Sequence, residues 1–238
     1  MASKSQKAAD RAAKAAAARE AQAKAERRRR LLTIGGVVLV MVVIVGGAVL
    51  VSLLNQEEVD AVDAGGSEYG VAIGDADAPR QVVIYEDFIC PHCGELEENS
   101  REGLAEAAAD GQVLVEYRPF NLLGDQTLPN AFAVVLEESG AEVAKEFHDL
   151  LFEHQSEFLE ELPSNDRLVE LAVEAGAEES DVRPGIEDLA ESDWVEDATQ
   201  EARDSGVSST PTVILDGEPF TDGGSAAELG QNLVEAVQ

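Results

Sequence analysis

The chain has 238 residues, of which 48 are acidic and 17 basic, so its formal net charge is −31 at pH 7. That length fits one globular domain with additions and excludes a large multidomain assembly. Such an excess of negative charge is repelled by phosphate backbones, so the main domain is not expected to bind nucleic acid.

The basic residues are concentrated at the N-terminus. Residues 1–30 contain ten Lys or Arg and three acidic residues, whereas the other 208 residues contain 7 basic and 45 acidic ones. Residues 31–54 then run for 24 positions without a charge. At ~1.5 Å per residue a helix of this length spans about 36 Å, enough for a hydrocarbon core of ~30 Å. The pattern predicts a basic tail over 1–30 and one transmembrane helix over 31–54.

Charge also predicts the orientation of this helix in the lipid bilayer. Arg27 to Arg30 precede it, and Glu57 and Glu58 follow it. The positive-inside rule places the N-terminus in the cytoplasm and residues 55–238 outside a cell membrane that the chain crosses once. The alternative is a cleaved signal peptide, whose apolar region runs for about 7–15 residues. The longer run favours an uncleaved signal-anchor.

Residues 55–68 are small and acidic, which predicts a flexible linker before a folded domain over 69–238. The first part of that domain has a β-α-β pattern. Residues 81–86 form an apolar, β-branched run typical of a buried strand, a helix is expected over about 93–110, and residues 113–117 form a second strand.

The rest of the domain is predicted to be largely helical. Apolar residues recur at helical spacing through 125–205, with breaks expected at 162–164, Gly176 and 183–185 and an N-cap at Asn165. A strand follows at 212–215. Asp216-Gly217 then predicts a hairpin turn into a paired strand at 218–221, before a closing helix over 225–237.

The chain has only two cysteines, Cys90 and Cys93, within the motif Cys-Pro-His-Cys. A disulfide that closes so short a loop stabilises a protein by only about 2 kcal/mol, so the pair is better suited to thiol–disulfide exchange than to stabilisation. An inert bridge and a zinc site are the alternatives. Zinc usually needs four ligands, and only His148 and His154 are available beyond the motif. We expect no metal and no cofactor.

Three features lower the expected pKa of the Cys90 thiol. Cys90 precedes the predicted helix, whose unpaired N–H groups and dipole stabilise a thiolate. Pro91 suits the first helical turn, and His92 can supply a positive charge or a hydrogen bond. A stabilised thiolate makes the disulfide form a strong oxidant. Cys93, one turn further, is expected to be the buried resolving thiol.

The Cys-Pro-His-Cys motif after a strand resembles that of the DsbA-like thiol–disulfide oxidoreductases of the thioredoxin fold. Residues 206–212, with Thr210-Pro211-Thr212 followed by Val-Ile-Leu-Asp-Gly-Glu, are similar to the cis-proline loop of that family, and residues 147–152 with Gln155 to a segment of its helical insertion. The resemblance implies a thioredoxin-like α/β fold with a helical insertion over about 125–205. It also implies that Thr210 and Pro211 support the active site and that a quinone-linked membrane partner re-oxidises it.

One position departs from the family. A buried acid often lies six residues before the first cysteine, and that residue is Ile84 here. Glu86 shares a strand face with Ile84 by alternation, so it is either a replacement proton acceptor or a solvent-facing acid at the strand end. His148 and His154 have no evident chemical partner and are expected to face solvent or to pack.

Three functions follow from these residues. The first is an anchored oxidase that passes its Cys90–Cys93 disulfide to secreted proteins as they fold, and His92 favours it. The second is a reductase or disulfide isomerase with the same motif, with which Thr210 is equally compatible. The third is a tethered, non-enzymatic binding or holdase module. Residues 65–238 carry 41 acidic and 7 basic residues, which indicates a salty environment or simply high solubility.

Overall fold

The computed structural model describes residues 64–238. The predicted basic tail, the transmembrane helix over 31–54 and most of the linker lie outside the described residues. Within 64–238, no helix is long and apolar enough to cross a membrane.

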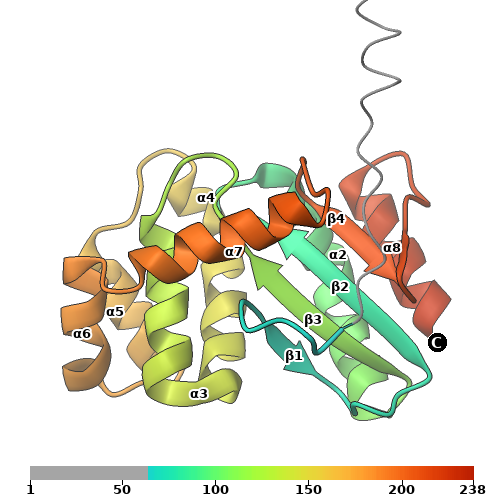
Figure 1. Ribbon diagram of the computed structural model, residues 1–238, viewed down its shortest axis with the longest axis horizontal. Helices are drawn as coiled ribbons and strands as arrows, with labels where there is room; N and C mark the ends of the chain where they lie inside the picture. The colour runs from blue at the N-terminus through green and yellow to red at the C-terminus, as the bar shows by residue number, and fades with distance from the viewer. Residues whose placement is uncertain (1–63) are drawn as a thin grey trace, which may run out of the picture. The chain divides into compact units, whose positions relative to one another are not determined.

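A five-stranded mixed sheet with strand order β1-β3-β2-β4-β5 forms the centre of the described domain (Figure 1). Strands β2 and β3 are parallel, and the other neighbours pair antiparallel. In chain order the elements are β1 (Val71–Ile73), β2 (Arg80–Glu86), α2 (Pro91–Ala109), β3 (Val113–Pro119), α3 (Thr127–Glu153), α4 (Gln155–Phe158), α5 (Asn165–Glu174), α6 (Glu179–Asp188), α7 (Ser192–Asp204), β4 (Thr212–Leu215), β5 (Glu218–Pro219) and α8 (Ala226–Val237).

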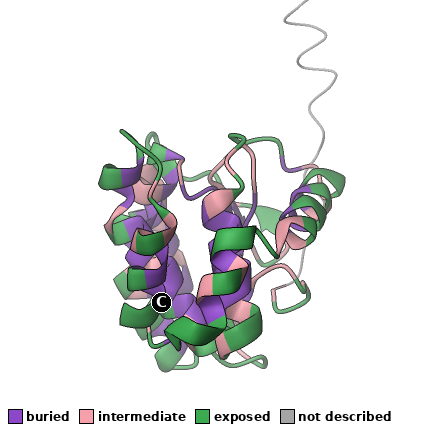
Figure 2. Cartoon of the chain, turned by 90° about the vertical axis from the view of Figure 1, so that its left-hand side faces the viewer, coloured by how far each residue is buried: buried purple, intermediate pink, exposed green. Residues whose placement is uncertain are grey.

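The predicted β-α-β unit is confirmed as β2, α2 and β3. Alternation along β2 sends Val82 and Ile84 into the larger core with helices α2 and α8, whereas Val83 and Tyr85 join a smaller core with α7. The sheet is therefore covered on both faces, and the helices show buried residues along their inner sides (Figure 2). Burial on both faces explains the continuous apolar run of β2.

The predicted hairpin is also confirmed. Asp216 and Gly217 both have positive φ, which a tight two-residue turn requires, and β5 pairs with β4 after them. Strand β1 was not predicted from the sequence. It has three residues, pairs antiparallel with β3 and places Val71 opposite Tyr117. A strand of three residues is too short to show the alternation of apolar and polar residues that predicts a strand.

Helices α3 to α7 form the predicted insertion between β3 and β4, and α3 to α6 stand beside the sheet (Figure 1). Helix α3 bends at Gly140, whose φ is 83°. Two local predictions are wrong. Ser164, not Asn165, caps α5, because its side chain accepts the Arg167 N–H. Residues 183–185 do not interrupt the helical structure, because Pro184 lies inside α6 between buried Val182 and Ile186. Helix α6 ends at Asp188, and its C-cap residue Leu189 has a left-handed backbone conformation.

Candidate active site

The two cysteines lie at the start of α2, just after the carboxyl end of β2. Cys90 is the N-cap residue, and Pro91 is the first residue of the helix, where its missing N–H has no cost. The backbone N–H groups of Cys93 and Gly94 donate to the Cys90 carbonyl at 3.0 and 3.3 Å. Both thiols are free in this structure, with Cys90 6% and Cys93 0% exposed.

The pKa of the Cys90 thiol is lowered to about 5. The largest cause is a hydrogen bond from Cys93; a side-chain hydrogen bond with Thr210 and the backbone N–H groups of Cys93 and His92 add to it, and burial opposes them. The imidazole of His92 is 72% exposed and turns toward Glu95, 3.5 Å away. The expected hydrogen bond from the His92 side chain to Cys90 is therefore wrong, whereas a contribution of its positive charge stays a prediction.

The loop that carries Thr210 and Pro211 closes over the motif from the far end of the sequence. The Thr210–Pro211 peptide bond is cis. The Cys90 Sγ lies 3.5 Å from the Thr210 carbonyl oxygen, 120 positions along the chain. Strand β4 pairs with β2 and carries this loop to the sulfurs.

The environment of Cys93 has the opposite effect on its thiol. Burial raises its pKa well above the ordinary value, and the hydrogen bond to Cys90 and the negative charge of Glu86 raise it further. The motif therefore pairs a sulfur that is a thiolate at neutral pH with one that holds its proton. This asymmetry is what dithiol–disulfide exchange requires.

Glu86 is not a solvent-facing acid at the strand end. It is 0% exposed and forms an ion pair with the His148 Nε2 through its Oε1, while its Oε2 has no hydrogen-bond partner in the described part of the chain. The prediction that Glu86 and Ile84 share one face of the strand is correct, because both side chains point to the same side of β2.

The expectation that His148 lacks a chemical partner is wrong. The ring is fully buried among the aromatic side chains of Phe88, Tyr117 and Phe152, and its Nδ1 lies 3.0 Å from Asp149 Oδ1. The charge of Glu86 and hydrogen bonds to both acids raise the pKa of His148 to about 9, although burial opposes this. His154 is the surface residue that was expected, paired with Glu157 at 2.9 Å.

Glu97 is a buried acid that the sequence analysis missed. It lies four residues after Cys93 on the same face of α2, is 1% exposed, and neither carboxylate oxygen has a hydrogen-bond partner within 64–238. Burial, and then the charge of Glu86, raise its pKa to about 8. Its spacing from Cys93 is the signal that could have found it.

Two further residues that were missed hold the active-site turn in place. The Gln155 amide donates to the carbonyl oxygens of Phe88 and Cys90, both at 2.9 Å. The Asp87 carboxylate accepts from the N–H groups of Ile89, Leu122 and Leu123 at 3.0, 2.9 and 2.9 Å. The turn is thereby tied to the helical insertion and to the segment after β3.

One group of described residues brings three potential metal ligands within 4.8 Å of one another: Glu97, His148 and Asp149. The Lys145 ammonium lies 2.6 Å from Asp149 Oδ1. That ammonium group would repel a cation, and it is already paired with Asp149, one of the three potential ligands. The group does not include either cysteine, so the arrangement does not support the zinc alternative.

Comparison with known proteins defines the class. The family model described as thioredoxin matches residues 66–235, and the chain belongs to that family. Within it, the chain is a thiol–disulfide oxidoreductase of DsbA type. It shares 26% identity and a TM-score of 0.60 with the reduced disulfide bond oxidoreductase DsbG of Mycobacterium tuberculosis, over 74% of this chain and 88% of that one. With the oxidised form of DsbA from the same organism it shares 27% identity and a TM-score of 0.56, over 71% of this chain and 92% of that one.

Two other matches carry less weight. BdbD of Bacillus subtilis has a TM-score of 0.62 over 75% of this chain and 98% of that one, but at 20% identity it shows the fold alone. The serine/threonine-protein kinase PknE of Mycobacterium tuberculosis is 35% identical over 68 residues. These residues are 29% of this chain and 12% of the kinase, so this chain matches only a small part of that protein.

Proposed function

We propose that this chain is a membrane-anchored oxidase that passes a Cys90–Cys93 disulfide to cysteine pairs of secreted proteins as they fold. The observation that carries the direction of transfer is the difference between the two thiols: the pKa of Cys90 is lowered to about 5, whereas that of Cys93 is raised. A stabilised Cys90 thiolate favours the dithiol form, and the disulfide form is then readily given up to a substrate.

The exchange proceeds in two steps. A substrate thiolate attacks Cys90 Sγ; the Cys90–Cys93 bond breaks, a mixed disulfide forms, and Cys93 leaves as a thiolate that takes up a proton. The second substrate thiol, once deprotonated, attacks the substrate sulfur of the mixed disulfide. A substrate disulfide forms, and Cys90 is released as a thiolate. Two electrons move from the substrate dithiol to the enzyme. Glu86 is the proposed proton partner of Cys93, because both are fully buried and the charge of Glu86 raises the pKa of the Cys93 thiol.

The substrate backbone is proposed to lie along Thr210 and Pro211, which border Cys90. The 24 uncharged residues 31–54, flanked by basic residues before and acidic residues after, support the anchor and an extracytoplasmic domain. Each turnover leaves a dithiol, so a re-oxidant is required. We propose a quinone-linked membrane protein, near which the anchor would hold the domain.

The reduction potential of the full chain, solubilised in detergent, tests the direction. Equilibration with glutathione buffers and thiol trapping should give a value near −120 mV, the oxidising end of the thioredoxin-fold range. A value near −270 mV would make donation to secreted proteins unfavourable and would establish the reductase instead.

The Cys90→Ser variant tests whether exchange is the function at all. It should lose all oxidation of a reduced substrate peptide, because no nucleophilic sulfur remains at the N-terminus of α2. A variant that still binds unfolded chains and protects them from aggregation as well as the parent does would support the holdase module instead.

A further inference from the structure

Three side chains form a continuous row that begins in the buried core and ends at the surface. Glu86 is on β2, and His148 and Asp149 are on α3, 62 positions later. Glu86 Oε1 pairs with His148 Nε2, and His148 Nδ1 lies 3.0 Å from Asp149 Oδ1. The side chains of Glu86 and His148 are 0% exposed, while that of Asp149 is 20% exposed. The row therefore connects the interior with solvent.

The inner end of the row belongs to Cys93. Cys93 lies in the same core as Ile84, whose side of β2 Glu86 shares, and Glu97, one turn after Cys93, has a carboxylate oxygen within 4.8 Å of a His148 ring nitrogen. The charge of Glu86 is also among the causes that raise the pKa of the Cys93 thiol. The Oε2 of Glu86 is buried and has no hydrogen-bond partner in the region that the structure describes. This carboxylate thus has one oxygen committed to His148 and one available to another group.

Other groups surround the row but do not replace it. Lys145 Nζ contacts Asp149 Oδ1 at 2.6 Å and lies 4.5 Å from the centre of the Tyr117 ring. Burial raises the pKa of the Tyr117 hydroxyl well above its ordinary value, so it does not release a proton at neutral pH. Glu97 lies near His148 and Asp149 but makes no hydrogen bond with them. Aromatic rings close off the rest of the His148 surface.

We propose that His148 is a proton-relay residue that supplies the Cys93 sulfur with a proton through Glu86, and that Asp149 holds the His148 ring in place. The proposal rests on the exchange reaction proposed above. Neither residue touches the substrate; both act through Glu86. A fully buried leaving thiolate needs a proton that bulk water cannot deliver directly, and the row supplies it.

The proton balance closes over one catalytic cycle. When the substrate attacks Cys90, Cys93 leaves as a thiolate. Glu86 takes the Nε2 proton of the His148 imidazolium and passes a proton to Cys93, which leaves a neutral His148 ring with its proton on Nδ1, toward Asp149. When the pair is re-oxidised, Cys93 loses its proton, which returns through Glu86 to His148 Nε2 and restores the imidazolium.

The test compares His148→Gln with His154→Gln in the full chain. Glutamine fills much of the histidine volume and still hydrogen-bonds, but it does not carry a proton. The second-order rate of mixed-disulfide formation with a fluorescent cysteine peptide is followed from pH 5 to 9 and divided by the thiolate fraction of the peptide. His148→Gln should lower this rate about 100-fold, the scale of general acid–base catalysis, and remove its pH dependence. His154→Gln should match the parent.

Iodoacetamide alkylation of Cys90 in the dithiol form separates the relay from the nucleophile. Its rate should be the same in both variants, since neither histidine touches Cys90. If His148→Gln and His154→Gln gave the same rate and pH profile, the relay would be excluded while the proposed function stood. If the parent chain exchanged no disulfide, the proposed function itself would fail.

A measurement on the parent chain decides the matter if His148→Gln does not fold. Nitrogen-15 spectra of the His148 ring, recorded against pH in the disulfide and dithiol forms, should show different titration midpoints, because the Cys93 proton lies on the same path. Identical midpoints in the two redox forms would overturn the relay.

Discussion

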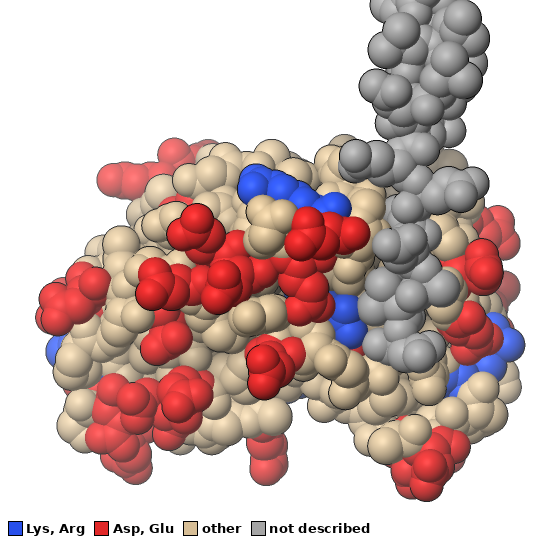
Figure 3. Space-filling model, viewed as in Figure 1, with Lys and Arg blue, Asp and Glu red and all other residues tan. Residues whose placement is uncertain are grey.

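Acidic side chains occupy two contrasting regions of this molecule. Below the active site, a buried cluster of Glu86, Glu97, Lys145, His148 and Asp149 balances its charges: two carboxylates face one ammonium and one imidazolium, and the pKa of Glu97 is raised to about 8, so it is mostly protonated at pH 7. On the surface, acids gather over the face that carries α7 with few basic residues among them (Figure 3).

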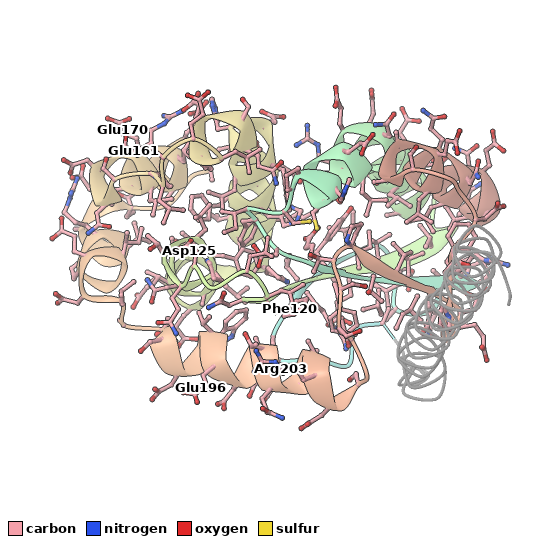
Figure 4. The ribbon with its side chains drawn as sticks, turned by 90° about the horizontal axis from the view of Figure 1, so that it is seen from above. Phe120, Asp125, Glu161, Glu170, Glu196 and Arg203 are labelled. Atoms are coloured by element: carbon pink, nitrogen blue, oxygen red, sulfur yellow. The ribbon has the colours of Figure 1, made fainter. Side chains whose placement is uncertain are left out.

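The surface acids point outward and have little to pair with. Glu161 and Glu170 lie at the rim of the helical insertion, and Glu196 lies on α7 (Figure 4). A single cation, Arg183, is shared by three carboxylates at 2.8–2.9 Å. The same residue type thus sets proton positions where it is buried and determines solubility where it is exposed. The difference is one of dielectric environment and pairing, not of composition.

The largest expected effect comes from removing one member of the buried cluster. Glu86→Ala leaves the His148 imidazolium buried without its main partner, so we expect the free energy of unfolding to fall by about 3–5 kcal/mol. The matched control is Glu153→Ala, which breaks the surface pair with Arg101 at 2.8 Å and should cost about 0–1 kcal/mol. Urea denaturation measures both.

A double variant sharpens this comparison. In Glu86→Leu with His148→Leu, both charges are replaced by apolar side chains, so most of the lost stability should return. If the single and double variants were equally unstable, the loss would come from packing rather than from an unpaired charge.

The second effect is a fall in stability as the pH rises, measured in the disulfide form, where the two sulfurs do not titrate. The pKa of His148 is raised from 6.5 to about 9, and that of Glu97 from 4.5 to about 8. A raised pKa gives stability that is complete below the unfolded value and is lost as the pH passes the folded value. The free energy of unfolding should therefore decrease between pH 4.5 and 8 through Glu97 and between pH 6.5 and 9 through His148, by up to about 1.4 kcal/mol per pH unit for each group.

Variants identify the groups responsible for this slope. His148→Gln should remove the decrease in the free energy of unfolding between pH 6.5 and 9, and Glu97→Gln should remove the decrease between pH 4.5 and 8. The control His154→Gln should show both decreases. In the dithiol form the lowered pKa of Cys90 acts in the opposite direction, adding stability from about pH 5 upward. If the pH dependence of stability were unchanged in His148→Gln and in Glu97→Gln, other groups would be responsible for it.

The sequence was sufficient for those features that depend on local pattern. The β-α-β unit, the hairpin at Asp216-Gly217 and the helical insertion all follow from hydrophobic period and turn residues. The two sulfurs follow from motif and position. Features set by contacts between distant segments were missed. Glu86 and His148 meet across 62 positions, and an isolated histidine within an apolar helix gives no sign of its partner.

The errors at His92 and Pro184 have different causes. Sequence position places His92 beside Cys90, but its rotamer directs the ring to Glu95 and solvent, and a rotamer is not encoded in sequence position. Pro184 is typical of a helix break, yet buried residues on either side keep α6 continuous. Tertiary packing overrode local preference at Pro184.

The smallest expected effect concerns salt, and it separates the two regions directly. Residues 65–238 carry 41 acids against 7 basic residues, and mutual repulsion between exposed charges weakens as salt screens them. The thermal midpoint should therefore rise between low and molar sodium chloride, by about 2–4 °C for each kcal/mol of repulsion removed. The buried cluster is screened far less, so the loss caused by Glu86→Ala should be the same at both salt concentrations. A flat midpoint would leave the acidic surface with a role in solubility alone, and a salt-dependent Glu86→Ala loss would mean that water and ions reach the cluster.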